Sequence, residues 1–535
     1  MKQMFNLTEN QSVGAVNTVS GAGRYQEDPL AVYQLLSKNK DHSLLLESAE
    51  IDKKHQLKSL LLTDTAVKII CNGNVVTLEP LTLNGEAAVK FAEQQLAQVA
   101  DLAFDNKTLI ATFAESATDL DEMSRLKATN PFQVLRLFKS LKNQDNHPFA
   151  VFLGGAFAFD MMSMSEKLPE VKDGENTCPD YVYYLAETLV IIDHEKRSSE
   201  ILGNVFTGEH QQKCYFEIAR RLSAIKQTLE SPIAPLNYQI DDNKPAIEAT
   251  TDISDEAFCQ TVNALKEHIR AGDIFQVVPS RTFSLPCENS IAAYHALKRS
   301  NPSPYMFYLK DSEFCMFGAS PESAIKYQQS NRQVEIYPIA GTRPRGFTKD
   351  GEFSLDLDSR IELELRQDKK ELAEHIMLVD LARNDVARVS KPGSRFVADL
   401  LKVDRYSHVM HLVSRVCGTL SEDLDALHAY QACMNMGTLS GAPKVRATEL
   451  IRQYEGKRRG SYGGAVGYIT GNGDMDTCIV IRSAFVKDQI AQIQAGAGVV
   501  YDSDPQSEAN ETRQKAQAVI NAIKNAASYQ EIADV

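Results

Sequence analysis

Four glutamates in two equally spaced pairs are the residues of this sequence with the clearest capacity for chemistry. Glu371 and Glu374 lie in DKKELAEHIMLVDLARND, and Glu508 and Glu511 lie in DPQSEANETRQKA. Each pair is spaced by three residues in a segment that is expected to be helical, so both carboxylates project from one helix face. Converging carboxylates in a partly buried cleft repel one another unless protons or a cation intervene. The pattern indicates either a Mg²⁺ site, since this ion needs only one or two carboxylates, or two ordinary solvated helices.

The composition is that of a soluble globular protein. The chain has 535 residues, 43% of them hydrophobic and 24% charged, and its length suggests two to four domains. A net charge of -14 argues against a nucleic-acid surface but allows a small anionic substrate held by a few arginines. The nine cysteines form no CxxC pair, so neither a zinc site nor a disulfide framework is expected. No signal-peptide core or membrane-spanning run is found, which predicts a cytoplasmic location.

The elements that must position the glutamates fall into two regions. We predict an N-terminal region at 1–230, a linker with three prolines at 231–253, and a catalytic region at 254–525. Ser254 is expected to cap a helix that ends near Gly272 and has an apolar face of Phe258, Val262, Leu265 and Ile269.

Strand candidates in the catalytic region arrive two at a time without an intervening helix. They are PYMFYLK, FCMFGAS, EIYPIAG, YGGAVGYIT, TCIVIRSAFV and IAQIQAGAGVVY. This order predicts mixed or antiparallel sheets rather than a doubly wound parallel sheet. We place Arg482 on an apolar strand, where the alternative to binding a carboxylate is a surface ion pair. We place His411 on an apolar helix, where the alternative to an active-site role is an ordinary core histidine.

A set of short motifs in fixed order carries a family resemblance. They are PYMFYL (304–309), GASPES (318–323), PIAGTRPRG (338–346), RYSHVMHLVS (405–414), GTLSGAPK (437–444), RRGSYGGAVGY (458–468), IVIRSA (479–484), AGAGVVYDSDP (495–505) and EANETRQKA (508–516). Together with the Glu371 helix they resemble the chorismate-utilising enzymes over about 255–520. The resemblance implies an α/β (α+β) fold: a two-layered sandwich of large, mainly antiparallel sheets, with helices outside and the active-site cleft between the layers.

The resemblance also implies roles for individual residues. Glu322 would act as the general acid that protonates the C4 hydroxyl, with His411 and Thr438 as further catalytic residues. Chorismate would be bound by Gly341, Thr342, Tyr462, Arg482, Gly496, Ala497 and Gly498. Glu374 and Glu511 resemble the ligands of a Mg²⁺ cofactor, with Glu371 and Glu508 close by or acting through water.

Two positions bear on the nucleophile. Family members that add water carry a lysine where this chain has Gln276, and members that form aminodeoxychorismate carry a lysine where it has Ala340. Both departures favour ammonia as the nucleophile and anthranilate as the product, formed through aminodeoxyisochorismate. The alternatives are an aminodeoxychorismate synthase large subunit and a non-catalytic chorismate or tryptophan sensor of the same fold.

The need for ammonia implies a partner protein, and a predicted feedback site implies a small-molecule effector. The chain has no cysteine in a glycine-flanked nucleophile turn, so we expect a separate glutamine amidotransferase subunit, in a heterotetramer of two large and two small subunits. LLES (45–48) resembles the signature of a feedback site for L-tryptophan in the anthranilate-forming members. That site would consist of Glu47, Ser48, Pro304, Tyr305, Met306 and Cys478; without the resemblance, LLES is simply the end of an apolar strand.

Overall fold

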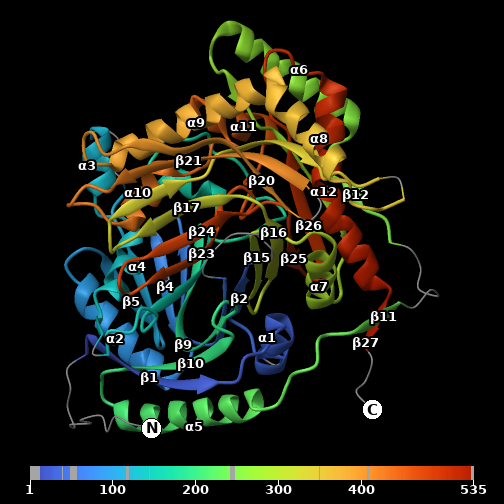
Figure 1. The fold of residues 1–535 in the computed structure, drawn as a ribbon. Coiled ribbons are helices and arrows are strands. Elements are labelled where there is room, and N and C mark those ends of the chain that lie inside the picture. The colour runs from blue at the N-terminus through green and yellow to red at the C-terminus, as the bar shows by residue number, and fades with distance from the viewer. Residues whose placement is uncertain are drawn as a thin grey trace.

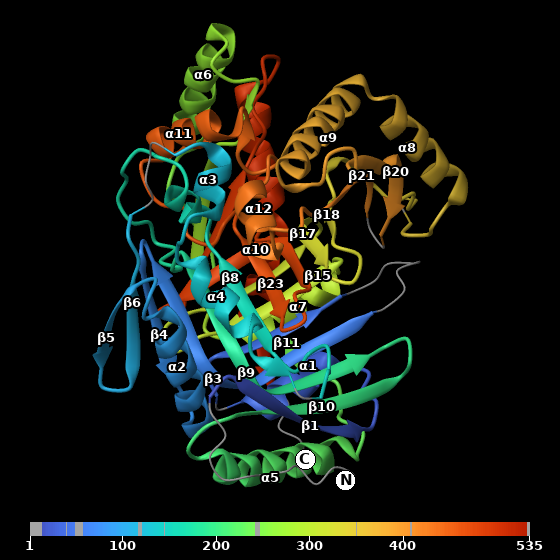
Figure 2. The same cartoon turned by 90° about the vertical axis from the view of Figure 1, so that its left-hand side faces the viewer.

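The structure is a computed structural model that describes residues 13–38, 40–48, 57–115, 120–143, 145–240, 247–348, 350–406 and 409–531. Its α-helices are α1 (Pro29–Ser37), α2 (Leu83–Leu96), α3 (Glu122–Lys127), α4 (Phe132–Lys139), α5 (Gln211–Leu229), α6 (Asp255–Ala271), α7 (Ser290–Ser300), α8 (Leu355–Gln367), α9 (Lys369–Val389), α10 (Ala426–Cys433), α11 (Lys444–Glu455) and α12 (Pro505–Ala527). Figures 1 and 2 place α5 at one end of the molecule, near β1 and β10, and α6 at the opposite end.

Strands of both regions form one hydrogen-bonded sheet, which has 23 strands within the described residues. Those before the predicted linker are β1 (Ala15–Gly23), β2 (Ser43–Glu47), β3 (Lys58–Asn72), β4 (Val75–Pro80), β5 (Asp101–Asp105), β6 (Thr108–Thr112), β7 (Lys142–Asn143), β8 (Phe152–Phe157), β9 (Tyr181–Asp193) and β10 (Ser198–Phe206). Those after its start are β12 (Thr250–Thr251), β14 (Ser280–Pro286), β15 (Tyr305–Lys310), β16 (Cys315–Ser320), β17 (Ser323–Gln328), β18 (Gln333–Ile336), β19 (Ile339–Pro344), β20 (Phe396–Arg405), β21 (Val409–Thr419), β23 (Ala465–Thr470), β24 (Met475–Ile479), β25 (Ser483–Lys487) and β26 (Ile490–Gly496). Among the described strands, the named pairings of this sheet are antiparallel except β1 with β7, which confirms the predicted large antiparallel sheet.

The two predicted regions are joined by direct strand pairing. β2 pairs with β15, with Glu47 opposite Met306, and β8 pairs with β23, with Gly155 opposite Gly467. The predicted linker lies between α5 and α6, yet strands from either side of it are neighbours in the sheet.

The helices that carry the glutamates begin at clear capping residues. Asp368 accepts hydrogen bonds from the first turn of α9, and Asp504 caps α12, whose first residue is a proline. The predicted helix after the linker is also confirmed, since Ser254 caps α6 and Gly272 ends it in the left-handed conformation with φ 84°. Local sequence therefore sets where these helices begin.

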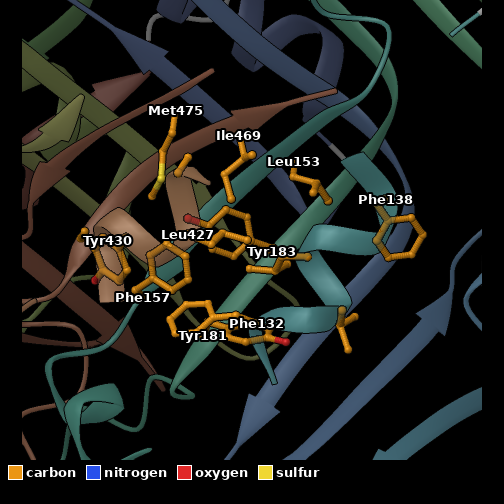
Figure 3. Close-up of a cluster of buried hydrophobic side chains, with 14 of the residues drawn as sticks. Phe132, Phe138, Leu153, Phe157, Tyr181, Tyr183, Leu427, Tyr430, Ile469 and Met475 are labelled. Carbon is orange, nitrogen blue, oxygen red and sulfur yellow. The ribbon is translucent and has the colours of Figure 1, made fainter. Parts of the chain in front are cut away.

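An aromatic core packs the two regions together (Figure 3). Phe157 of β8 stacks on Tyr430 of α10 with ring centroids 4.3 Å apart, and it contacts Tyr183 of β9 at 4.8 Å. Phe132 of α4 joins the same group. Each buried aromatic side chain contributes roughly 1.5–3 kcal/mol, so this core stabilises the interface between the regions as well as each region.

Two local predictions were wrong. His411 lies on β21, not on a helix, because a short apolar run such as VMHLV fits both periods and the sheet decides between them. Ser407 and His408 of the same motif lie outside the described residues. Arg482 lies between β24 and β25, not within one strand, and has φ 49°. The TCIVIRSAFV run is thus two strands separated at the arginine.

Candidate active site

Glu322 lies in the short connection between β16 and β17 and is only 7% exposed. Its backbone carbonyl accepts a hydrogen bond from the Ile479 N–H at 3.0 Å, and its Oε1 accepts one from the Thr438 hydroxyl at 3.1 Å. Burial raises the pKa of this carboxyl from 4.5 to about 8, and the Thr438 bond lowers it only in part. Glu322 therefore holds a proton at neutral pH, as a general acid must.

His411 and Thr342 face each other across the β19–β21 pairing. Thr342 Oγ1 lies 2.8 Å from His411 Nδ1. Burial, with the nearby charge of Arg482, lowers the pKa of His411 to about 4, so the imidazole is neutral at physiological pH. The register of the pairing shifts at Gly341, which has φ 83°, and a Cβ there would lie 3.3 Å from Glu371 Oε2. This bulge brings the strand close to the glutamates of α9.

Arg482 presents a partly buried guanidinium to the same site. Burial lowers its pKa, while the charges of Glu511 and Tyr462 act in the opposite direction. Its carbonyl accepts a hydrogen bond from the Ala319 N–H, and among the described residues none accepts a hydrogen bond from its guanidinium. A guanidinium with donors to spare is suited to a carboxylate of an incoming ligand.

Gly496, the last residue of β26, and Gly498, two residues further on, lie in close contact with these side chains. A Cβ at Gly496 would lie 3.0 Å from Tyr462 Oη, and one at Gly498 would lie 2.8 Å from Gln276 Nε2 and 3.5 Å from Glu374 Oε1. The absence of side chains therefore lets this backbone lie close to Tyr462, Gln276 and Glu374, where a larger residue would displace them.

Two further observations concern hydrogen bonds beside Gly496 and Gly498. The Ala497 N–H already donates to the Pro279 carbonyl at 3.1 Å, so the predicted anion contact by this amide would compete with a strand hydrogen bond. Gln276 donates to Glu374 Oε1 at 3.4 Å, whereas the buried Gln276 Oε1 has no hydrogen-bond partner among the described residues. A buried acceptor without a donor is costly, and a ligand N–H would satisfy it.

The four glutamates of the two helices lie within electrostatic reach of one another. Burial raises the pKa of Glu374, and the charges of Glu371 and Glu511 raise it further. Burial and the charge of Glu511 do the same for Glu508. Carboxylates that destabilise one another in this way are the oxygen donors that Mg²⁺ prefers.

Two cations partly neutralise this group. Arg343 bonds Glu371 Oε1 at 2.9 Å, and Lys515 bonds Glu511 at 2.7 Å. Within the described residues, no set of three or more His, Cys, Asp or Glu side chains is close enough to enclose a metal ion. The chemistry of the donors fits Mg²⁺, an ion that takes only one or two protein carboxylates.

Lys515 is a site residue that the sequence reasoning missed. Its Nζ donates to the Gly496 carbonyl at 3.0 Å, and its charge lowers the pKa of both Glu322 and Glu374. Its position four residues after Glu511 on one helix was the available signal.

The six residues predicted for the feedback site come together around one cavity of about 400 Å³, which we call the effector cavity. Lys58 and Lys326 line it as well. Glu47, Ser48, Pro304, Tyr305, Met306 and Cys478 all line its wall.

The effector cavity lies close to Glu322 along the sheet. Cys478 of the cavity pairs with Ser323, the residue after Glu322, and Ile479 bonds the Glu322 carbonyl. A single strand pair, β17 with β24, therefore separates the two sites.

Comparison with known proteins agrees with this geometry. The model of the chorismate binding enzymes matches residues 88–521, so the chain belongs to this family, as the motifs predicted. The similarity is more specifically to anthranilate synthase component 1. That of Vibrio cholerae is 56% identical over 501 residues, covering 93% of this chain and 94% of the relative. That of Escherichia coli is 53% identical over 510 residues, covering 95% and 97%.

A solved structure supports the same grouping. The crystal structure of anthranilate synthase component I from Streptococcus pneumoniae matches with a TM-score of 0.68 at 29% identity, covering 88% of this chain and 93% of that one. None of the helices in the described part of the chain is long and apolar enough to span a membrane.

Proposed function

We propose that this chain is a Mg²⁺-dependent anthranilate synthase large subunit, a carbon–oxygen lyase of tryptophan biosynthesis. It would convert chorismate and ammonia to anthranilate, pyruvate and water. The observation that carries the proposal is a site that holds the buried carboxyl of Glu322, the buried imidazole of His411 and a guanidinium, that of Arg482, with no acceptor among the described residues.

Binding would rest on fixed donors for the two carboxylates of chorismate. The Arg482 guanidinium would hold one of them, helped by the Tyr462 hydroxyl, which lies close to the Gly496 backbone. Lys515 would add a positive charge, since it already reaches the Gly496 carbonyl. Such groups orient the ring so that its C4 hydroxyl faces Glu322.

Proton transfer would follow from the two perturbed pKa values. Glu322 gives its proton to the C4 hydroxyl, which leaves as water while ammonia forms a bond to C2, and the ammonium group that results returns one proton to the Glu322 carboxylate. The neutral His411, held by Thr342, is able to accept a proton in the later step. Loss of the C2 proton then breaks the bond from C3 to the enolpyruvyl oxygen, which leaves the aromatic ring, and the enolpyruvate that departs takes up a proton to become pyruvate.

Mg²⁺ would be held by Glu374 and Glu511, with Glu371 and Glu508 nearby. When bound, the ion would supply a Lewis acid for the ring carboxylate of chorismate. Arg343 and Lys515 bond Glu371 and Glu511 in this structure, so these cations would yield to the metal when the site is filled.

Ammonia would bind where Gln276 offers an acceptor. Gln276 Oε1, which has no partner in the described part of the chain, suits an N–H donor, and an amide cannot deprotonate water. We propose that a glutamine amidotransferase subunit supplies the ammonia, in a heterotetramer of two large and two small subunits. The relatives are named component 1, and this name supports the existence of a second component.

The effector cavity would bind L-tryptophan as a feedback inhibitor. Its volume of about 400 Å³ and its mixture of apolar and charged walls suit an amino acid with a large aromatic side chain. Lys58 or Lys326 would offer a charge to the ligand carboxylate. All nine cysteines are free thiols, which supports a reducing, cytoplasmic setting.

The experiment is direct. The purified chain is incubated with chorismate, Mg²⁺ and ammonium sulfate, and anthranilate fluorescence is followed with and without L-tryptophan. The chain contains no tryptophan, so its own fluorescence interferes little. Anthranilate that forms with ammonium but not with glutamine alone, and is suppressed by L-tryptophan, supports the proposal. A folded chain that forms no anthranilate contradicts it.

A further inference from the structure

The carboxylate of Glu47 is already bonded by two side chains of α7. Lys298 Nζ donates to Oε2 at 2.7 Å, and the Tyr294 hydroxyl donates to Oε1 at 2.6 Å. The Glu47 side chain is only 4% exposed, so its carboxylate is sheltered from water. Glu47 thus connects the wall of the effector cavity to α7.

Lys298 has a second partner at hand. Its Nζ lies 3.5 Å from Oδ1 of Asp28, the residue that caps α1. Burial lowers the pKa of Lys298, but the charges of Glu47 and Asp28 raise it above its ordinary value. The ammonium is therefore a fixed positive charge with two discrete acceptors, as a two-position switch requires.

α7 links this switch to the active site in two ways. It ends at Ser300, five residues before β15 begins at Tyr305 in the cavity wall. It also packs along α12, where Tyr294 and Leu297 share one buried cluster with Val519 and Ile520. The first turns of α12 carry Glu508 and Glu511, so a shift of α7 reaches the glutamates through packed side chains.

We propose that Lys298 is a positioning residue that couples the effector cavity to the catalytic site, by exchanging Glu47 for Asp28 when the cavity is filled. The inference rests on the proposed function, because the effector is an amino acid whose ammonium would compete with Lys298 for Glu47. Two cations cannot share one sheltered carboxylate at full strength. Release of Lys298 changes the position of α7, and with it that of α12.

Coupling is measured as a ratio of affinities. L-tryptophan is titrated with the protein, and its own fluorescence is read, since the chain has no indole. The titration is repeated with saturating chorismate and Mg²⁺ but without ammonia, so that no turnover occurs. The ratio of the two dissociation constants is the coupling factor, typically about 5- to 150-fold in allosteric proteins.

Three variants distinguish a role of Lys298 in coupling from a role in folding or in effector binding. Lys298→Met removes the charge, Lys298→Arg keeps it, and Lys310→Met removes a comparable lysine that bonds Asp41 at the other end of β15. We expect Lys298→Met to form anthranilate within about twofold of the wild-type rate without effector, which also shows that it folds. Its coupling factor should fall at least fivefold, while the other two variants keep theirs.

The outcomes are distinguishable. A Lys298→Met protein with the wild-type coupling factor overturns the inference and leaves the proposed function standing. Loss of L-tryptophan binding itself in this variant also overturns it, because Lys298 would then be part of the binding site. A wild-type chain that neither binds L-tryptophan nor shows coupling overturns both the inference and the proposed feedback site, whereas the synthase activity is overturned only if no anthranilate forms.

Discussion

Replacement of Glu322 by glutamine is expected to make the protein more stable at pH 8 and far less active. The carboxyl is 7% exposed and its pKa rises from 4.5 to about 8 on folding. Glutamine has nearly the same shape and keeps the oxygen to which Thr438 donates, but it carries no ionisable group. The variant therefore isolates the effect of the titrating proton.

The magnitude follows from the two pKa values. The pKa is raised in the folded state, so between pH 4.5 and about 8 the native protein keeps a proton that the unfolded chain has lost. The free energy of unfolding of the wild type therefore falls as pH rises through this window, by about 1.4 kcal/mol per pH unit. From pH 5 to pH 8, Glu322→Gln should gain about 3 kcal/mol of stability relative to the wild type.

The assay is urea unfolding of both proteins, followed by circular dichroism at pH 5 and pH 8. Burial of the extra amide N–H group costs roughly 1–3 kcal/mol, but this cost is the same at both pH values and cancels in the comparison. Glu313→Gln, at an exposed position between β15 and β16, serves as the control and should show no such gain.

Activity should move in the opposite direction. Loss of a general acid lowers kcat by roughly 10²- to 10⁴-fold, and the wild-type rate should fall as pH rises above about 8, where Glu322 loses its proton. A stability difference that does not grow with pH would refute the reasoning, because it would mean that Glu322 is ionised in the folded protein.

Four further predictions concern the same site. Thr438→Val removes the hydroxyl that lowers the pKa of Glu322, so the alkaline limb of the kcat–pH profile should move to higher pH. An unchanged limb would contradict the assignment of Glu322 as the general acid. Gly498→Ala places a methyl group 2.8 Å from an amide nitrogen, so kcat/KM for chorismate should drop at least about tenfold; Gly21→Ala, with open space at Cβ, is the control. Arg482→Lys loses the planar fork, so kcat/KM should fall by roughly 10- to 100-fold, mostly through KM; a change confined to kcat would argue against a binding role. Removal of Mg²⁺ with a chelator should abolish turnover, and added Mg²⁺ should restore it; activity that survives exhaustive chelation would exclude the metal.

Features encoded in short segments were predictable from the sequence. The helix capped by Ser254 and ended by Gly272 was found because its signals are local, and both glutamate helices were found for the same reason. The wall of the effector cavity was assembled from motifs far apart in the chain, and only a family resemblance could place Glu47 beside Met306.

Features that depend on long-range packing were not predictable. A histidine in a short apolar run gives no sign of whether it lies on a strand or a helix, and β21 is a strand because β19 and β20 flank it. Spacing also did not show that Lys515 and Arg343 would bond two of the four carboxylates. Likewise, Lys298 lies on a helix outside all the motifs, and only the folded chain brings it to Glu47.

The pairing of β2 with β15 has a consequence for biosynthesis of the chain. Glu47 and Met306 are register partners although 259 positions separate them, since 306 minus 47 is 259. At roughly 5–20 residues per second, a ribosome takes about 13–50 s to make that stretch. During this time the apolar strand SLLLE has emerged without the strand that will cover one of its edges. Nascent chains are therefore exposed to edge-to-edge association until the catalytic half appears, and a chaperone that shields strand edges should increase the yield of folded protein.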